Sequence, residues 1–195
     1  MLSDVLHTVH GDFRLKEGHL AFDPQTKAMA GSIIVDSSSG KSGSTARDKR
    51  MTRDILEASR FPEMLFNPIG SSGSIALSGT SDVDVTGSFV IHGQAHKITI
   101  PVHVQTSQNQ VIATGQFLVP YVQWGMKNPS TFLLKLNDKV EIHFNAVGHI
   151  KAAANAAVPS SEDKVRIYLL CIDGASASGN DCPTELVQNL RFCDG

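Results

Sequence analysis

Apolar and polar residues alternate along most of this chain, which is the pattern of β-strands that bury one face. The most regular segment runs from Lys97 to Gln105, where the apolar residues at every second position from Ile98 to Val104 share one face. The brief turns between such segments favour an all-β antiparallel sandwich or barrel over alternating βαβ units. The pattern predicts about nine short strands, at residues 12–15, 19–22, 29–36, 65–66, 75–78, 83–92, 97–105, 111–120 and 140–147.

Two places interrupt the alternation. Lys16–Gly18 separates Asp12–Leu15 from His19–Phe22, and this spacing predicts a hairpin with a short glycine-containing loop. Pro68 is expected to end the strand that begins at Leu65, because proline cannot donate a hydrogen bond to the ladder.

One stretch, about residues 45–60, has helical spacing in place of alternation. The Ser-Thr pair at its start can cap a helix, and Asp48 suits the positive end of the helix dipole. Apolar residues between Met51 and Leu56 form a modest stripe on an otherwise charged helix, and Pro62 ends it by forcing the preceding residue into an extended conformation. A single short helix between two strands is expected to cover one end of the barrel.

The chain has 195 residues, enough for one domain with a sizeable core, and a net charge of −2 with 18% charged residues. This balance points neither to nucleic acid nor to an acidic membrane surface as a partner. No apolar run approaches the roughly 18 residues that a membrane-spanning helix needs. The first residues, MLSDVLHTVHG, lack the regions of a signal peptide, so the sequence as it stands predicts a cytoplasmic protein.

The character of the sequence changes after Ile150. Residues 151–162 are rich in Ala, Ser and Pro and predict a linker, Val165–Ile172 could form one more strand, and the remainder has no clear period. We therefore assign 1–150 to the barrel domain and 151–195 to a linker and C-terminal appendage that contributes little to the core. The appendage holds all three cysteines. Their odd number and their equal spacing, which matches no zinc-binding pattern, favour a structural or incidental role over a metal or redox site.

Motifs for nucleotide binding or nucleophilic catalysis are weak. Gly40-Lys41-Ser42 resembles part of a phosphate-binding loop, but Val35 stands where that motif requires its first glycine. No Gly-x-Ser-x-Gly motif occurs either. Serines in these loops are better explained by turns.

Four of the eight histidines are candidates for a metal site. His92 and His96 flank a turn and could face a common ion, with His103 or His143 as a third ligand. Hydrogen bonding of these histidines at turns and on strand surfaces is the simpler interpretation. Trp124, the only tryptophan, lies in an irregular loop that either contacts the barrel rim or packs its own aromatic residues; the rim is slightly favoured.

A set of short blocks then carries a family resemblance. The blocks are Gly11-Asp12-Phe13, Gly18 to Pro24, Arg47-Asp48 with Met51 and Leu56, Arg60 to Glu63 ending at Phe66, Gly87 to Gly93, His96 to Val102, and Asp138 to Gly148. No single block is specific, but their order and spacing over residues 5–150 resemble the YceI-like family of polyisoprenoid-binding, lipocalin-like proteins.

The resemblance implies an extended barrel that encloses a long apolar tunnel for an isoprenoid lipid or quinone, with no cofactor. A barrel of about eight strands can hold one small ligand. Few polar groups converge in the sequence, as expected of a non-enzymatic carrier. The residues expected to bind the ligand lie on apolar strand faces: Phe13, Leu20, Phe22, Ile33, Val35, Phe66, Phe89, Ile91, Ile98, Ile100, Val102, Ile142 and Phe144.

Two features depart from the family pattern. Members usually begin with one more strand, commonly after a signal peptide. The barrel of this chain is therefore expected to lack one strand and to leave an open edge. Such an edge would let two copies pair as a homodimer. Members are typically periplasmic or secreted, which conflicts with the cytoplasmic prediction from the N-terminus. The alternatives to lipid binding are a metal-dependent hydrolase using His92, His96 and His103, and an interaction module that pairs its open edge with a partner strand.

Overall fold

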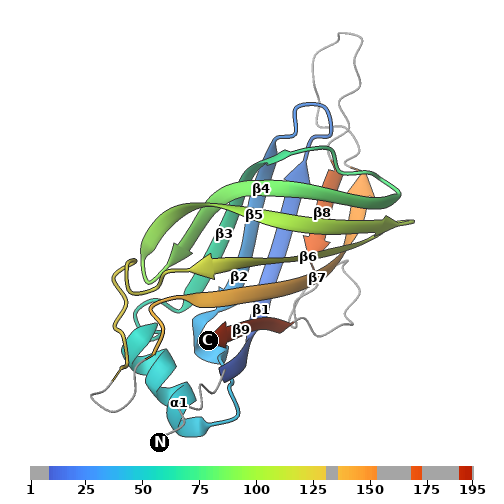
Figure 1. The fold of residues 1–195 in the computed structure, drawn as a ribbon. Coiled ribbons are helices and arrows are strands. Elements are labelled where there is room, and N and C mark those ends of the chain that lie inside the picture. The colour runs from blue at the N-terminus through green and yellow to red at the C-terminus, as the bar shows by residue number, and fades with distance from the viewer. Residues whose placement is uncertain (1–8, 131–135, 153–167, 173–188, 195) are drawn as a thin grey trace, which may run out of the picture.

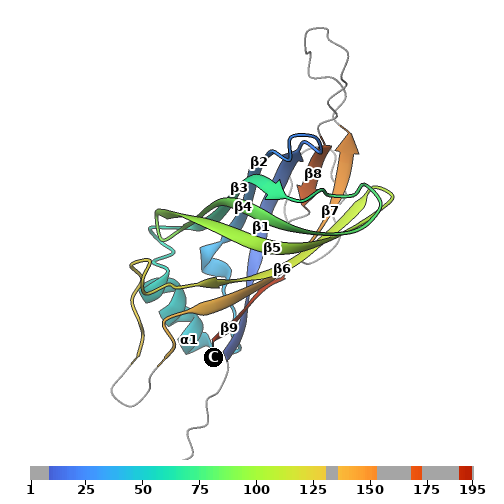
Figure 2. The ribbon, with the colours of Figure 1, turned by 45° about the horizontal axis from the view of Figure 1, so that its top comes forward.

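Seven long antiparallel strands curl into the wall of a barrel (Figures 1 and 2). The structure, a computed structural model, describes residues 9–130, 136–152, 168–172 and 189–194. The seven strands are β1 (Val9–Phe22), β2 (Met29–Asp36), β3 (Glu63–Ser72), β4 (Gly79–Ile91), β5 (Gln94–Ser107), β6 (Gln110–Val119) and β7 (Val140–Ala152). Between β2 and β3 the chain forms the 3-10 turn η1 (Ser37–Ser39), the helix α1 (Thr45–Arg50) and the π-helical η2 (Met51–Ile55). Because α1 lies over one end of the barrel (Figure 1), the predicted all-β, lipocalin-like barrel with one short helix is confirmed.

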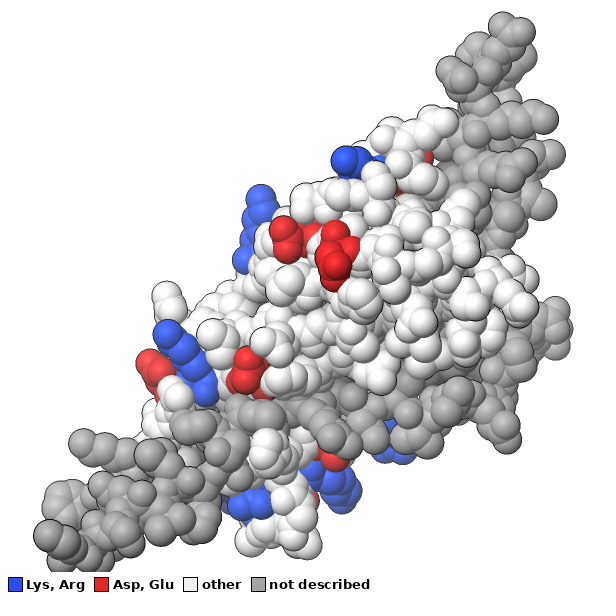
Figure 3. All heavy atoms as spheres, turned by 45° about the vertical axis from the view of Figure 1, so that its right-hand side comes forward, with Lys and Arg blue, Asp and Glu red and all other residues white. Residues whose placement is uncertain are grey.

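Alternation places one face of each strand in the interior. The odd-numbered residues of β4 from Val83 to Ile91 are buried, as are the even-numbered residues of β5 from Ile100 to Thr106. Polar groups lie outside: the hydroxyl oxygens of Thr86 and Thr99 are 2.9 Å apart. On the face shown in Figure 3, acidic and basic side chains are scattered among many uncharged ones. The wall thus combines an apolar inner surface with a sparsely charged outer one.

β1 is one continuous strand of 14 residues, not the hairpin expected around Lys16–Gly18. A β-bulge between Leu15 and Glu17 shifts its register against β2. The buried positions are odd-numbered up to Leu15 and even-numbered from the bulge to Phe22. The extra residue reverses the phase of alternation, which makes one strand resemble two in the sequence. β3 likewise continues through Pro68, because a second bulge begins at that residue.

Two short strands, β8 (Tyr168–Ile172) and β9 (Asn189–Asp194), pair between β1 and β7. β9 pairs with Val9–Arg14 of β1, and β8 pairs with Gly18–Phe22. They follow one another along this gap, β9 toward α1 and β8 toward the opposite end (Figure 1). This pairing corrects the expectation that the barrel lacks a strand and has an open edge at β1. It also differs from the expectation that 151–195 lies outside the barrel, although the division into two domains stays a prediction.

The helical segment is shorter than the predicted 45–60. After α1 ends at Arg50, η2 closes with a hydrogen bond of 2.9 Å from the Leu56 N–H to the Met51 carbonyl. Glu57 then adopts a φ of 47°, a left-handed conformation that ends the helix before Pro62. No helix in the described residues is long and apolar enough to cross a membrane.

Candidate ligand-binding cavities

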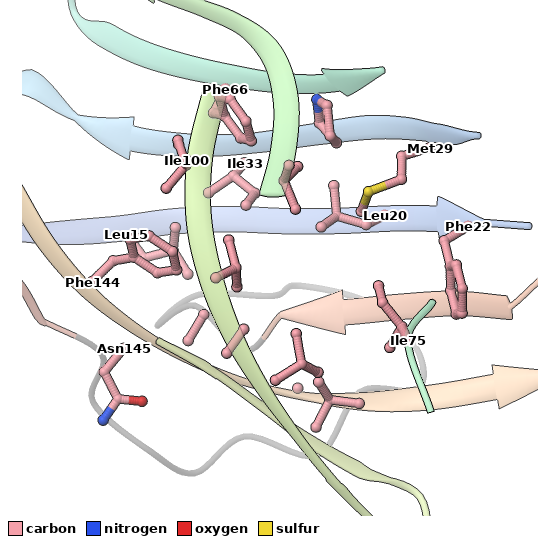
Figure 4. A pocket seen from close by; sticks show the side chains of 18 of the residues that line it. Leu15, Leu20, Phe22, Met29, Ile33, Phe66, Ile75, Ile100, Phe144 and Asn145 are labelled. Atoms are coloured by element: carbon pink, nitrogen blue, oxygen red, sulfur yellow. The ribbon is translucent and has the colours of Figure 1, made fainter. Parts of the chain in front are cut away.

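An apolar cavity of about 170 Å³ lies inside the barrel, lined by all seven long strands. In Figure 4, Leu20 and Phe22 of β1 and Ile33 of β2 lie around the same space as Ile100 of β5. The described residues that line this cavity include no charged side chain. Its one amide, Asn145, lies at the margin of the group (Figure 4). The first cavity therefore offers a ligand almost only dispersion contacts and burial from water.

A second cavity of about 560 Å³ lies at the α1 end of the barrel. Strand residues such as Phe13 and Ile142 form part of its wall, and Met51 and Leu56 close it from the helical segment. The loop after β6 adds Tyr121, whose hydroxyl donates a hydrogen bond of 2.6 Å to the carbonyl of Asn137. This cavity differs from the first in having charged as well as polar lining: Ser42, Ser44, Arg47 and Arg50.

Four side chains line both cavities and therefore lie between them: Val35, Met64, Phe89 and Phe117. The rings of Phe89 and Phe117 pack edge to face there, with centroids 5.5 Å apart and planes at 80°. Such aromatic packing holds the rings in a defined geometry. The barrel interior thus holds two neighbouring cavities that share these four lining side chains.

Twelve of the thirteen residues predicted to bind a ligand line this space. Ile98 is the exception: it is half-buried and packs against the hydrophobic clusters around both cavities. That the twelve contact a ligand stays a prediction. The first cavity takes Leu20, Phe22, Ile33, Phe66, Ile100, Val102 and Phe144, the second takes Phe13, Ile91 and Ile142, and Val35 and Phe89 border both.

Sequence reasoning missed the lining residues outside the regular strands. Arg47 and Arg50 come from α1, whereas Tyr121 and Met126 come from the loop after β6. The Met126 N–H donates a hydrogen bond of 3.0 Å to the Tyr121 carbonyl, which folds that loop back on itself. The apolar stripe around Met51 was a usable signal for the helix, but the loop residues follow no period.

β5 and β6 pair only from Val102–Gly115 to Ser107–Gln110, so the two strands diverge toward the α1 end. The loop after β6 closes against β5 there. The ring of Trp124 stacks on His96, with centroids 3.9 Å apart and planes at 6°. Burial lowers the pKa of His96 from its ordinary value of 6.5. Trp124 therefore contacts the barrel wall, as the favoured interpretation of its loop expected.

The histidines considered as metal ligands do not converge. Within the described residues, no group of three or more His, Cys, Asp or Glu is placed to hold a metal ion. Each histidine has a different neighbour: His92 lies 3.5 Å from Glu57, His96 stacks on Trp124, His103 lies 2.7 Å from Asp82, and His143 lies 3.3 Å from Glu141. The arrangement expected for a hydrolase with His92, His96 and His103 is not present.

A curled antiparallel barrel with an elongated apolar interior and a helix over one end defines a lipocalin-like binding fold. The comparison with known families agrees with this class, because the family model of the YceI-like domain matches residues 2–148. The chain belongs to the YceI-like family.

Solved structures share the fold at low sequence identity. BcnA from Burkholderia cenocepacia is similar with a TM-score of 0.58 at 18% identity, over 72% of this chain and 95% of that one. A YceI protein from Campylobacter jejuni is similar with a TM-score of 0.56 at 14% identity, over 77% of this chain and 88% of that one. Among curated proteins, a UPF0312 protein of Vibrio parahaemolyticus is 30% identical over 94 residues. That match covers 47% of this chain and 48% of the relative, about half the length of each.

Proposed function

We propose that this protein binds a long apolar lipid of the isoprenoid class inside its barrel and carries it without changing it chemically. The observation that supports this proposal is the pair of neighbouring cavities inside the barrel, which share four lining residues and are lined mainly by apolar side chains. The isoprenoid class is what the resemblance to the YceI-like family implies.

The energetics of burial favour an apolar chain as the ligand. Each methylene group moved out of water contributes about 0.8 kcal/mol. Specificity for a head group needs precisely placed polar partners, and the first cavity has only Asn145 at its margin. We infer that this part of the barrel selects a ligand by its length and apolar character.

The test is a carboxylate placed in the wall of the first cavity. Ile100 lines this cavity and is 4% exposed. In a filled core Ile100→Glu would unfold the protein, because an unpaired buried charge costs several kcal/mol. Beside a cavity that loses its lipid, the carboxylate can keep water. We expect Ile100→Glu to fold and to purify without lipid, as measured by circular dichroism and by mass spectrometry of organic extracts.

Lys97→Glu is the matched control, because Lys97 lies on the same strand and is exposed. It should retain lipid like the parent. Parent protein that carries no extractable lipid and takes up no fluorescent isoprenoid analogue would contradict the proposed function.

A further inference from the structure

The ladder of hydrogen bonds between β5 and β6 stops partway along both strands. Toward α1 their last pair is Val102 with Gly115, so Gln94–Pro101 of β5 and Gln116–Val119 of β6 do not pair with each other. The carbonyl oxygen of Pro101 lies toward β6, 2.5 Å from the position that a Cβ atom at Gly115 would take. Because an antiparallel pair exchanges the N–H and C=O groups of the same residue, and proline has no N–H, the ladder ends here. Beyond this point the two strands separate toward α1 (Figures 1 and 2), and we call the unpaired stretch the β5–β6 gap.

Trp124 covers the β5–β6 gap from the loop after β6. Its ring stacks on His96 of β5, and its centroid lies 6.2 Å from that of Phe89, the residue of β4 that pairs with His96. Phe89 lines both cavities, whereas Trp124 lines neither. Because Trp124 is half-buried, it reaches from the surface of the barrel to a side chain that borders both cavities.

The backbone of this loop is held by hydrogen bonds, whereas the indole is held by ring contacts. The Trp124 N–H donates to the Pro120 carbonyl and the Gly125 N–H donates to the Val122 carbonyl, both at 3.1 Å. The indole ring packs against the two rings of β4 and β5. Rotation about the side-chain torsions of Trp124 can therefore move the indole out of the gap while the loop keeps its hydrogen bonds.

Two features beside the gap suit an opening for an apolar chain. The Nε2 atom of His96 is buried without a hydrogen-bond partner, which costs free energy in the closed arrangement. When the indole rotates away, water can reach this atom, and this offsets part of the lost ring contact. Leu118, on the unpaired part of β6, is 59% exposed. It offers an apolar chain a first contact on the outer surface.

We propose that the apolar chain enters and leaves the barrel sideways through the β5–β6 gap, with the indole of Trp124 as the gate. This inference rests on the proposed function and adds the route of exchange. Successive residues of a strand face opposite sides, so Leu118 lies outside the gap and Phe117 inside it. Phe117 lines both cavities. A chain that passes the gate therefore reaches both cavities without threading through the barrel from one end.

Exchange rates test the gate, because a gate changes how fast a ligand moves and not how tightly it binds. Stopped-flow fluorescence measures the association of a fluorescent isoprenoid analogue with the full chain, and displacement by excess geranylgeraniol measures its release. We expect Trp124→Ala to raise both rate constants by about tenfold and to change Kd by less than about threefold. A side chain that only stabilises the bound ligand would change the release rate alone.

His96→Phe should change the rates in the opposite direction. Phenylalanine keeps an aromatic partner for Trp124 and removes the unpaired nitrogen, so the closed gate becomes more stable and both rate constants should fall by about tenfold. Acrylamide should also quench the emission of Trp124, the only tryptophan, less than in the parent. Val122→Ala is the matched control, because Val122 lies on the same loop and packs against the core but lines neither cavity. It should exchange ligand like the parent.

Three results would overturn the gate and leave the proposed function standing. Faster release with unchanged association in Trp124→Ala would give the indole a structural role only. Rates in His96→Phe at or above those of the parent would contradict the gate even if Trp124→Ala did not fold. The same acceleration in Val122→Ala as in Trp124→Ala would assign the effect to the loop as a whole. A parent protein that binds no analogue would contradict the proposed function itself.

Discussion

His96 shows how burial sets the chemistry of one side chain. It lies on β5 among the even-numbered positions that face inward, and its ring is stacked flat on Trp124. Its Nε2 atom is buried without a hydrogen-bond partner. An unpaired buried nitrogen disfavours the charged imidazolium, so desolvation lowers the pKa of His96 in the folded protein.

This shift makes stability depend on pH in a defined direction. The unfolded chain has the ordinary pKa of 6.5 at His96 and the folded protein a lower one. As the pH falls through 6.5, the unfolded state binds more protons and the free energy of unfolding decreases; well above this pH the group has no effect. We expect the melting temperature to fall from about pH 7.5 to about pH 5, and to fall less in His96→Phe, which keeps the stack without titrating. Equal acid sensitivity of both proteins would show that His96 is not the cause.

Single residues were predictable from the sequence where they lie on regular strands. A period of two assigns each residue to a face, which is why Ile100 and Phe144 could be placed at the interior from their spacing alone. Arg50 and Met126 could not, because their positions depend on how α1 and the loop after β6 pack over the end of the barrel. Ile98 shows the limit of this rule. Its position in the alternation is that of an interior residue, but its side chain packs against the two hydrophobic clusters of the barrel wall.

At the scale of elements, the bulge in β1 and the pairing of β8 and β9 were the least predictable features. A bulge changes the phase of alternation locally and cannot be told from a turn without the partner strand. The pairing of β8 and β9 with β1 and β7 joins residues far apart in the sequence. Alternation in β4 and β5, in contrast, has one phase throughout, so each was predicted as a single strand, although β4 begins at Gly79 and not at Val83, and β5 begins at Gln94 and not at Lys97.

The pairing of the C-terminal strands reverses the expectation that the tail is dispensable. A chain ending at Ala152 would leave backbone groups of β1 and β7 unpaired along their shared gap. We expect this truncation to lower the free energy of unfolding by more than about 2 kcal/mol and to promote association of the exposed edges. Urea unfolding and light scattering measure the two effects.

Leu170→Pro in the full chain isolates the contribution of β8. Leu170 pairs with Leu20 of β1 and Ile150 of β7, and proline removes its N–H from the ladder. This variant should show part of the loss seen on truncation. An unfolding midpoint unchanged by either alteration would restore the view of residues 151–195 as an appendage.

At the scale of the whole molecule, the fold combines three features that suit the proposed binding of a long lipid. The strands supply an apolar interior, α1 adds arginine side chains to the lining of the second cavity only, and four side chains lie between the two cavities. None of these follows from composition, which is nearly neutral and sparsely charged. They depend on the curling of the sheet, which brings Val35 of β2 and Phe117 of β6 together between the two cavities.

The side chains between the two cavities predict how affinity depends on the length of the ligand. If a chain passes from the second cavity into the first, affinity should rise from geraniol through farnesol to geranylgeraniol, by about 0.8 kcal/mol for each further methylene group buried. Val35 is 6% exposed and lines both cavities, so Val35→Phe adds bulk between them. We expect this variant to bind geraniol like the parent and to gain no affinity from the longer chains.

Ile91→Phe, which alters only the second cavity, is the control for general overpacking. Fluorescence displacement with the three alcohols measures the trend. The same length dependence in Val35→Phe as in the parent would mean that the ligand does not pass from the second cavity into the first.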